Sequence, residues 1–379
     1  MDRAKISIIV FATILTFSAL YAPQPIQPII MEYFGVTKGQ AALLTTVTML
    51  PLSLSPLLYG YILEAVSAKT VLIISILVLG VCQLIFFVSS SFNLLILLRV
   101  VEGLAIPAIL TGLMTYISTM TTKDNVQKVM AIYISSTIMG GFAGRFFSGA
   151  LSYYFNWRVM FLLLGISLVI SLLFILKLDH NKTAVNKINA KAAAVVIKQK
   201  GFLPVYMMIF SMFFMFAGML NFIPFRLKEI NPDSNALILG GVYTGYIMGI
   251  VTSLTSLKLI KILKGEQNAM FVGLTIFICS TLLFVSRDNL FLFIGMFVFC
   301  AGMFMTHTIA SGYLNKISDS NKGVTNGLYV SFYYSGGTLG SILPGYIYEN
   351  YGWNNFLIVL AAIMTISVVL AKRSLRSSY

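Results

Sequence analysis

Three charged residues fall inside strongly apolar stretches of this 379-residue chain and are its strongest candidates for chemistry. Arg99 and Glu102 lie three positions apart in LLRVVEGLAI, a spacing that places them on one face of a helix. Arg145 occurs in GGFAGRFFSG. A charge in apolar surroundings is costly unless it is paired or hydrated, so each residue is a functional candidate. Their types point to a site that binds a charged solute or moves a proton.

Glu102 is the residue best suited to exchange a proton. Burial favours the neutral form of a carboxyl group, whereas a nearby guanidinium favours the charged form. The helical rise places Arg99 about 10 Å and Glu102 about 15 Å from one membrane face, with Arg145 near the level of Arg99. Glu102 is therefore predicted to bridge to either arginine, and the three residues are predicted to couple transport to protons. The alternative is a static structural ion pair.

The composition shows that these charges sit in a membrane protein. Hydrophobic residues make up 58% of the chain and charged residues 10%, with a mean hydropathy of +0.90, whereas soluble chains carry about 25% charged residues. Apolar stretches of roughly 20 residues, long enough to cross a bilayer as helices, follow one another. We predict an all-α polytopic membrane protein with spans at about 6–29, 41–63, 70–90, 93–118, 128–151, 157–178, 202–225, 236–257, 267–286, 290–314, 324–347 and 353–371.

The second half of the chain repeats the first with an offset of 196 positions. The glycines and the tryptophan of GGFAGRFFSGALSYYFNW, at 140–157, recur in GGTLGSILPGYIYENYGW, at 336–353. The first apolar stretch looks like a signal peptide, but Pro28 recurs as Pro224, so we expect it to be retained as the first span. The three intramembrane charges break the repeat, because their equivalent positions are uncharged: Gly295, Val298 and Ser341.

The distribution of Lys and Arg predicts the orientation of the chain. With both termini inside, five of the 26 fall in outer loops and two inside spans, and the others lie in inner segments. The outer five are Lys38, Arg158, Arg226, Lys228 and Arg287. This positive-inside bias predicts cytoplasmic termini. The small basic loops and the abundance of Ile, Asn and Lys predict a multi-pass protein of a bacterial inner membrane. The positive-inside bias also explains the net charge of +14, and scattered basic residues argue against binding nucleic acid.

Six spans repeated once in the same orientation are typical of a transporter built from parallel repeats. We predict an N-terminal six-helix bundle at 1–178, a basic cytoplasmic linker at 179–200 and a C-terminal six-helix bundle at 201–379.

Three motifs carry a resemblance to a known family. The loop after the second span, GYILEAVSAK, contains Gly60, Glu64 and Lys69, the fourth span contains RVVEG, and the fifth contains GGFAGRFFSG. At these motifs the chain resembles the major facilitator superfamily, and within it the arabinose-efflux-permease-like branch of bacterial drug and sugar exporters. It departs from the family pattern at Glu102, where glutamine is usual, and at Arg145, where proline is usual. The resemblance implies the major facilitator fold, with twelve transmembrane helices as two parallel six-helix repeats, and a gating role for the loop residues.

The resemblance also places the fifth and eleventh helices between the two bundles. Glycines four apart let helix backbones approach closely, so we predict that smooth glycine faces allow the bundles to rock, with plain close packing as the alternative. The predicted gating and packing glycines are Gly140, Gly144, Gly149, Gly336, Gly340 and Gly345. Trp157 and Trp353, at outer span boundaries, are predicted to anchor in the membrane interface.

The resemblance assigns the central cavity to the first, fourth, seventh and tenth spans. The predicted substrate-binding residues there are Tyr21, Gln24, Gln27, Asn221 and His307. Prolines at 23, 25 and 28 are expected to interrupt the first span and to expose its polar groups. For His307 a plain hydrogen-bonded role is the favoured alternative.

The sequence contains no nucleotide-binding loop, nucleophile elbow or metal-ligand cluster. We therefore predict no enzyme activity, no cofactor and no metal. The predicted function is that of a monomeric secondary active transporter, a proton-coupled antiporter that exports small organic or drug-like molecules by alternating access. Its partners would be a small-molecule substrate, protons and membrane lipids. The alternatives are an organic-anion or metabolite facilitator or importer, with Arg99 and Arg145 as ligands, and a non-transporting membrane sensor on the same fold.

Overall fold

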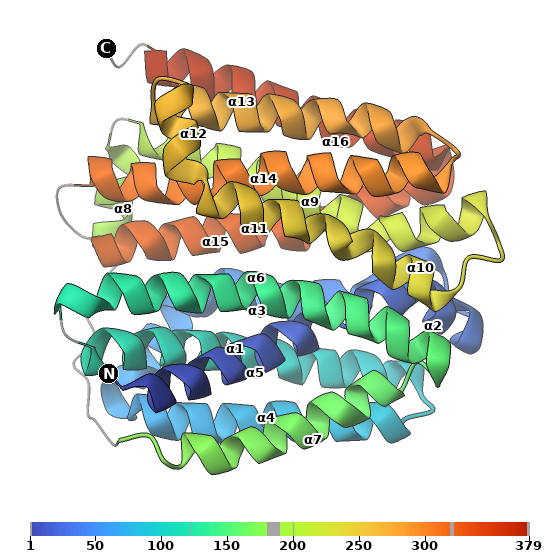
Figure 1. Cartoon of the computed structure of the whole chain (residues 1–379), viewed down its shortest axis with the longest axis horizontal. Coiled ribbons are helices and arrows are strands. Elements are labelled where there is room, and N and C mark those ends of the chain that lie inside the picture. The colour runs from blue at the N-terminus through green and yellow to red at the C-terminus, as the bar shows by residue number, and fades with distance from the viewer. Residues whose placement is uncertain (1, 122, 180–189, 200, 319–321, 377–379) are drawn as a thin grey trace. The chain divides into compact units, whose positions relative to one another are not determined.

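The computed structural model describes residues 2–121, 123–179, 190–199, 201–318 and 322–376, although some side chains within helices, such as those at 123–128, are not described. In this part of the chain all regular structure is helical (Figure 1). The chain forms two compact units, Met1–Lys187 with Asn235–Gly241 and Ile188–Ser234 with Val242–Tyr379. The predicted domain boundaries stay predictions, because half of the predicted linker lies outside the described residues.

The first unit contains the helices that cover the first six predicted spans, together with one short helix from later in the chain. They are α1 (Arg3–Tyr21), η1 (Gln24–Ile26), α2 (Gln27–Phe34), α3 (Lys38–Ala65), α4 (Ala68–Val88), α5 (Phe92–Met120), α6 (Lys123–Tyr154), α7 (Val159–Ile175) and α10 (Ala236–Gly241). Polar caps begin several of them. The Thr37 hydroxyl accepts from the backbone N–H of Gln40, whose side chain accepts from the Thr37 N–H, and these bonds satisfy donors that the start of α3 would leave unpaired.

The second unit contains α8 (Ala190–Lys198), α9 (Phe202–Ile230), η2 (Val242–Gly245), α11 (Tyr246–Leu254), α12 (Ser256–Ile262), α13 (Glu266–Cys279), η3 (Ser280–Val285), α14 (Asn289–Ile317), α15 (Lys322–Gly340) and α16 (Leu343–Arg376). Within α16 the backbone is kinked at Gly352, whose φ of 82° favours a residue without a side chain. The same helix pairs form in both units: α1 packs on α6 as α9 packs on α15, and α4 packs on α5 as α13 packs on α14.

Helices coincide with all the predicted spans. Within the described part of the chain, eight stretches are long and apolar enough to cross a membrane, and one of them, Val324–Leu375, covers the last two predicted spans. The helix α7 is apolar but has only 17 residues. The remaining two predicted spans correspond to α3 and α6, in which some side chains are not described. The predicted all-helical membrane fold is thus confirmed.

The first span is broken, as its prolines predict. Pro23 has no N–H to donate to the carbonyl of Ala19, four residues earlier, so α1 ends at Tyr21 and the chain passes through the turn η1 before α2 begins. In the second unit the equivalent helix, α9, runs unbroken for 29 residues. The position equivalent to Pro23, 196 residues later, is Met219. The two repeats therefore differ where the first span changes direction.

Two glycines bring α6 close to α1. A Cβ atom added at Gly140 would lie 2.7 Å from the carbonyl oxygen of Ile14, and one added at Gly144 would lie 2.5 Å from that of Ser18. The Ser18 hydroxyl donates to the Gly140 carbonyl at 3.1 Å. No side chain larger than hydrogen fits at these two positions unless the helices separate.

The repeat-related glycines do the same in the second unit. A Cβ atom at Gly336 or Gly340, on α15, would collide with the carbonyl oxygens of Phe210 and Phe214 on α9. These phenylalanines stand 196 positions after Ile14 and Ser18, so the contact register is repeated along with the sequence. All four glycines provide close packing of two helices within one unit, and their predicted role in rocking stays a prediction.

The prediction that both tryptophans anchor in the membrane interface is wrong. Trp157 is 5% exposed and Trp353 is 3% exposed. The Trp157 ring packs edge-on against Phe86 and Tyr33, and the Trp353 indole N–H donates to the carbonyl oxygen of Phe284 at 2.7 Å. Each ring is buried inside its own unit, because aromatic neighbours offer it a larger apolar contact than lipid head groups would.

Candidate functional site

Arg99 is fully buried on α5, and its guanidinium donates to the backbone of two other helices. Nη1 donates to the carbonyl oxygen of Ala19 at 3.0 Å and Nη2 to that of Leu20 at 2.6 Å, both in the last turn of α1. Nε donates to the carbonyl oxygen of Leu44 on α3 at 2.6 Å. Since Pro23 cannot donate to the Ala19 carbonyl, Arg99 supplies the missing donor at the helix break.

Glu102 is also fully buried, and both oxygens of its carboxylate are engaged. Oε2 accepts from Nη1 of Arg99 in a buried ion pair, and Oε1 accepts from Nε2 of Gln83 on α4 at 2.8 Å. The pairing with Arg99 follows the predicted spacing. The predicted alternative bridge from Glu102 to Arg145 is not formed, because the two carboxylate oxygens are occupied by these other partners.

Gln83 is a member of this cluster that sequence reasoning missed. Its side chain is fully buried, and its Oε1 atom has no hydrogen-bond partner among the residues that the structure describes. The only local signal is a single amide in the apolar run LVLGVCQLIFFV. An amide has a donor end and an acceptor end, so Gln83 can donate to a charged Glu102 or, after rotation of the amide, accept from a protonated one.

Arg145 forms a second buried centre, between α6 and the broken first span. Nε donates to Oε1 of Gln24 at 2.6 Å, and Nη1 donates to the carbonyl oxygen of Gly141 at 2.7 Å. The guanidinium carbon lies 3.8 Å from the centre of the Tyr21 ring, in cation–π geometry. The structure thus brings together three predicted residues, Arg145, Tyr21 and Gln24.

The other predicted substrate-binding amides bond within their own units. Gln27, at the start of α2, donates from Nε2 to the Thr45 hydroxyl on α3 at 3.0 Å. Asn221 on α9 donates from Nδ2 to the carbonyl oxygen of Ser341 at 2.8 Å. Ser341 is the repeat equivalent of Arg145. In each unit, therefore, a buried amide of the first span, Gln24 or Asn221, is hydrogen-bonded to this same position of the repeat. Gln27 and Asn221 are fully buried, and their role toward a substrate stays a prediction.

His307 on α14 belongs to an aromatic cluster in the second unit. Its Nδ1 shares a hydrogen bond of 2.7 Å with the hydroxyl of Tyr329 on α15, which also donates to the His307 carbonyl at 3.1 Å. The Tyr333 ring lies 4.8 Å from the imidazole and stacks on Phe213 at 3.7 Å. His307 is therefore hydrogen-bonded in place, in line with the alternative favoured from the sequence.

The loop motif is described only in part. Nζ of Lys69 donates to the carbonyl oxygen of Leu176 at 2.7 Å, which caps the C-terminal end of α7. The side chain of Glu64 and the surroundings of Gly60 lie outside the described residues. The gating role predicted for this loop stays a prediction.

The last pair of predicted glycines meets different neighbours in the two units. A Cβ atom at Gly149 would lie 2.5 Å from the carbonyl oxygen of Ala236 and 2.6 Å from Cα of Gly240, so this glycine lets α6 pack on α10. A Cβ atom at Gly345 would collide with the Phe222 ring on α9. Both positions require glycine for close approach.

The assignment of Arg226 to an outer loop is wrong. Arg226 lies within α9 and is 6% exposed. Its Nη1 donates to Oε1 of Glu229 at 3.1 Å, its guanidinium carbon lies 5.6 Å from the Trp353 ring, and the Tyr348 hydroxyl donates to Oε2 of Glu229. The second unit therefore also holds a buried arginine, because a carboxylate one turn away and a flat ring compensate for its desolvation. The spacing of Arg226 and Glu229 was the signal that could have revealed it.

No group of three or more His, Cys, Asp or Glu residues in the described part of the chain is placed to hold a metal ion. The arrangement instead offers one carboxyl group that can take up a proton, together with two arginines that contact the broken first span.

Comparisons with known proteins agree with this architecture. A sequence model of the Major Facilitator Superfamily matches residues 9–285 and 264–378. The inner membrane transport protein YnfM of Escherichia coli (strain K12) is 24% identical over 368 residues, covering 96% of this chain and 88% of that protein. An uncharacterized MFS-type transporter, YybF of Bacillus subtilis (strain 168), is 25% identical over 368 residues, covering 96% and 91%. The crystal structure of the nucleoside transporter NupG has the same fold, with a TM-score of 0.78 at 15% identity and 99% of each chain covered. The chain therefore belongs to the major facilitator superfamily and is a multi-pass membrane transporter.

Proposed function

We propose that the chain is a proton-coupled antiporter that exports small organic molecules, with Glu102 as the group that takes up and releases the proton. The observation that carries the proposal is the contact of this buried carboxylate with Arg99, because Arg99 itself holds the broken end of α1. A proton on Glu102 would remove the negative charge that faces the guanidinium.

The cluster connects the proton site to the predicted substrate residues through one helix break. Arg99 bonds to Ala19 and Leu20, which immediately precede Tyr21, and Gln24 follows in η1. If the hydrogen bonds from Arg99 to these carbonyls lengthen or break, the adjoining segment can move. That segment carries the Tyr21 ring and the Gln24 amide, which contact Arg145. Protonation of Glu102 and the position of Tyr21 and Gln24 are thereby coupled, which is what exchange of a proton for a solute requires.

Gln83 supports the assignment of Glu102 as a titrating group. The Oε1 atom of this amide, which accepts from no described residue, offers an acceptor to a protonated carboxyl group, while its Nε2 atom donates to the ionised form. Both protonation states of Glu102 then retain a hydrogen bond in a buried site. The resemblance of the GGFAGRFFSG motif to the efflux branch of the family supports export rather than uptake.

The test uses purified protein in sealed liposomes that contain a pH-sensitive dye. A pH gradient is imposed, and cationic, zwitterionic and anionic organic solutes are added one at a time. We expect one class of solute to evoke proton movement, and we expect Glu102→Gln to abolish that movement while retaining solute binding, because glutamine keeps the size and the acceptor but cannot ionise.

Glu266→Gln is the matched control, since Glu266 is paired with Lys316 in an exposed ion pair. That variant should transport like the natural protein. Proton movement that persists unchanged in Glu102→Gln would sink the proposal.

A second function, an organic-anion facilitator, is favoured by the environment of Arg145. Arg99 donates to three carbonyls and a carboxylate, whereas Arg145 donates to the Gln24 amide oxygen and the Gly141 carbonyl and lies against the Tyr21 ring. These partners of Arg145 are neutral, so its charge attracts an anionic solute. In the same liposomes, entry of an anionic solute without proton movement, unaffected by Glu102→Gln and lost in Arg145→Ala, would identify this function.

A further inference from the structure

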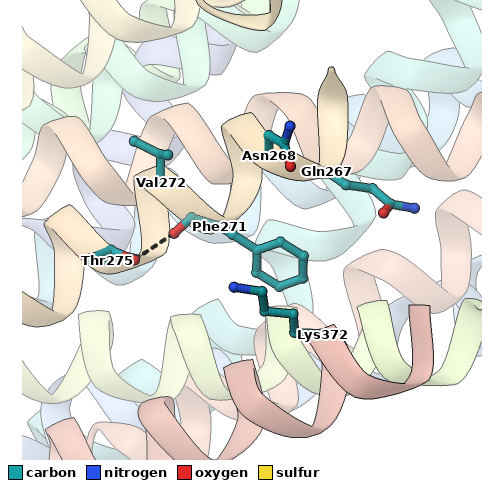
Figure 2. Close-up of a pocket in the computed structure, with 6 residues that line it drawn as sticks. All are labelled: Gln267, Asn268, Phe271, Val272, Thr275 and Lys372. Atoms are coloured by element: carbon teal, nitrogen blue, oxygen red, sulfur yellow. Dashed lines mark hydrogen bonds between the residues drawn. The ribbon is translucent and has the colours of Figure 1, made fainter. Parts of the chain in front are cut away.

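A groove on the second unit lies between α13 and α16, away from the residues discussed above. Its volume is about 290 Å³, and it is lined by Gln267, Asn268, Phe271, Val272, Thr275 and Lys372. Figure 2 shows five of these side chains along α13 and Lys372 reaching toward them from α16. Small-molecule sites usually measure about 300–1,000 Å³, so the groove is sized for part of a ligand rather than for a whole drug-like molecule.

The lining changes from polar to apolar along α13. Gln267 and Asn268 lie in its first turn, next to Glu266, where the helix begins. Phe271 and Val272 follow one turn later, and Val272 is 37% exposed. The lining ends at Thr275, about 12 Å from Gln267 at the rise of a helix, and the Thr275 hydroxyl donates to the Phe271 carbonyl at 2.8 Å, so it presents little polarity to a ligand (Figure 2).

The cation that lines the groove, Lys372, lies beside Phe271 and has no acidic partner among the residues that the structure describes (Figure 2). Lys372, near the end of α16, forms no ion pair with any residue that the structure describes, and its Nζ atom lies 5.8 Å from the centre of the Phe271 ring. Lys316, in contrast, is neutralised by Glu266 at 3.2 Å. The neighbouring Arg373 is exposed. A positive charge without a counter-ion among the described residues, beside the apolar part of a groove between two membrane-spanning helices, is complementary to a lipid with an anionic head group.

We propose that this groove binds one anionic phospholipid, with the phosphate at Lys372 and an acyl chain along Phe271 and Val272. Basic pockets between transmembrane helices, at the membrane face that carries excess Lys and Arg, favour such head groups. The polar residues Gln267 and Asn268 already donate within the protein, to the Tyr313 hydroxyl at 3.0 Å and the Leu263 carbonyl at 3.2 Å, so Lys372 is the residue that selects the head group. The groove does not include Glu102. Lipid binding there can therefore be tested separately from the proposed transport function.

The experiment measures bound lipid directly. Full-length protein in detergent is stripped of lipid and titrated with phosphatidylglycerol, with phosphatidylcholine of the same acyl chains, or with inorganic phosphate. Native mass spectrometry then counts the lipid molecules retained. We expect one phosphatidylglycerol to be retained preferentially and to raise the apparent melting temperature, while phosphatidylcholine and inorganic phosphate produce neither effect.

Two pairs of variants separate the groove from general charge and general apolar surface. Lys372→Gln should lose the preferentially retained lipid, whereas Lys261→Gln, at an exposed lysine on α12 outside the groove, should keep it. Val272→Trp should fill the groove and exclude the lipid, whereas Ile276→Trp, at an exposed residue of α13 outside the lining, should not. Equal loss in Lys372→Gln and Lys261→Gln, or retention of the lipid by Val272→Trp, would overturn the proposal. So would equal retention of phosphatidylcholine.

Discussion

The guanidinium of Arg99 forms four hydrogen bonds, three to backbone carbonyls and one to Glu102. Three helices, α1, α3 and α5, therefore meet at one side chain. The charge at position 99 has a structural cause as well as a proposed functional one, because Pro23 leaves the Ala19 carbonyl without a donor. In the second repeat, where α9 is unbroken, the equivalent position is Gly295.

We expect Arg99→Ala to lower the free energy of unfolding by about 3–5 kcal/mol, the usual cost of leaving one partner of a buried ion pair alone. The three carbonyls lose their donor in the same step. Glu102→Gln should cost clearly less, because the glutamine oxygen still accepts from Arg99. Unfolding of both variants by heat or urea in detergent micelles measures the difference.

The double variant Arg99→Ala with Glu102→Gln serves as the control for this prediction. Removing the unpaired carboxylate should recover part of the stability lost in Arg99→Ala. If the single and double variants are equally stable, the ion pair does not account for the loss.

The sequence predicted the pairing within one helix but not the partners from other helices. Residues three apart, such as Arg99 and Glu102, share a helix face, and this can be read from spacing alone. Gln83 reaches Glu102 from α4, and no local pattern records such a tertiary contact. Arg226 was misplaced because the predicted span ended at 225. In the structure α9 continues to Ile230, and the Glu229 carboxylate and the Trp353 ring allow Arg226 to be buried within it.

At the scale of helices, glycines determine how closely α6 approaches α1 and α15 approaches α9. A methyl group at Gly144 would meet the carbonyl oxygen and Cα of Ser18 at 2.5 and 2.6 Å. These atoms belong to the backbone, so they cannot rotate away as a side chain would. Relief requires the two helices to move apart along their whole contact.

Gly144→Ala is therefore expected to destabilise the protein by about 1–3 kcal/mol, the usual cost of overpacking a close contact. Gly312→Ala is the matched control, because Gly312 lies within α14 and has no atom within 4 Å of the added methyl group. It should be neutral or stabilising by up to about 1 kcal/mol, since alanine favours a helix. Melting temperatures in detergent measure both changes, and equal melting temperatures would contradict the packing argument.

Hydropathy predicted the existence of the helices better than their interruptions. The prolines predicted the break after α1, because they cannot donate the helical hydrogen bond. The turns η2 and η3 lie in apolar stretches without proline, VYTG and STLLFV. Their geometry depends on tertiary packing, such as the hydrogen bond of 2.7 Å from the Tyr243 hydroxyl to the Leu220 carbonyl, which a single stretch of sequence does not record.

At the scale of the whole molecule, the bias of Lys and Arg predicts the orientation in the membrane. With both termini cytoplasmic, the turn at Asn231 faces outward and α12 faces inward. Asn231 and Lys261 are both exposed, so each can carry a reporter.

We expect a membrane-impermeant maleimide to label Asn231→Cys but not Lys261→Cys in intact bacterial cells, and to label both after permeabilisation. The background carries Cys279→Ser, because Cys279 is exposed, while Cys82 and Cys300 are buried. Labelling of Lys261→Cys alone in intact cells would reverse the predicted topology.

The dependence of the α1 break on Arg99 has an evolutionary consequence. A descendant that replaces Pro23 with an ordinary residue regains a backbone donor for Ala19 and relaxes selection for the arginine. A descendant that loses the arginine first must tolerate an unpaired carbonyl at membrane depth, so that order of events is disfavoured. We therefore expect related sequences to keep Pro23 and Arg99 together. Where only one of the two has been replaced, we expect it to be the proline.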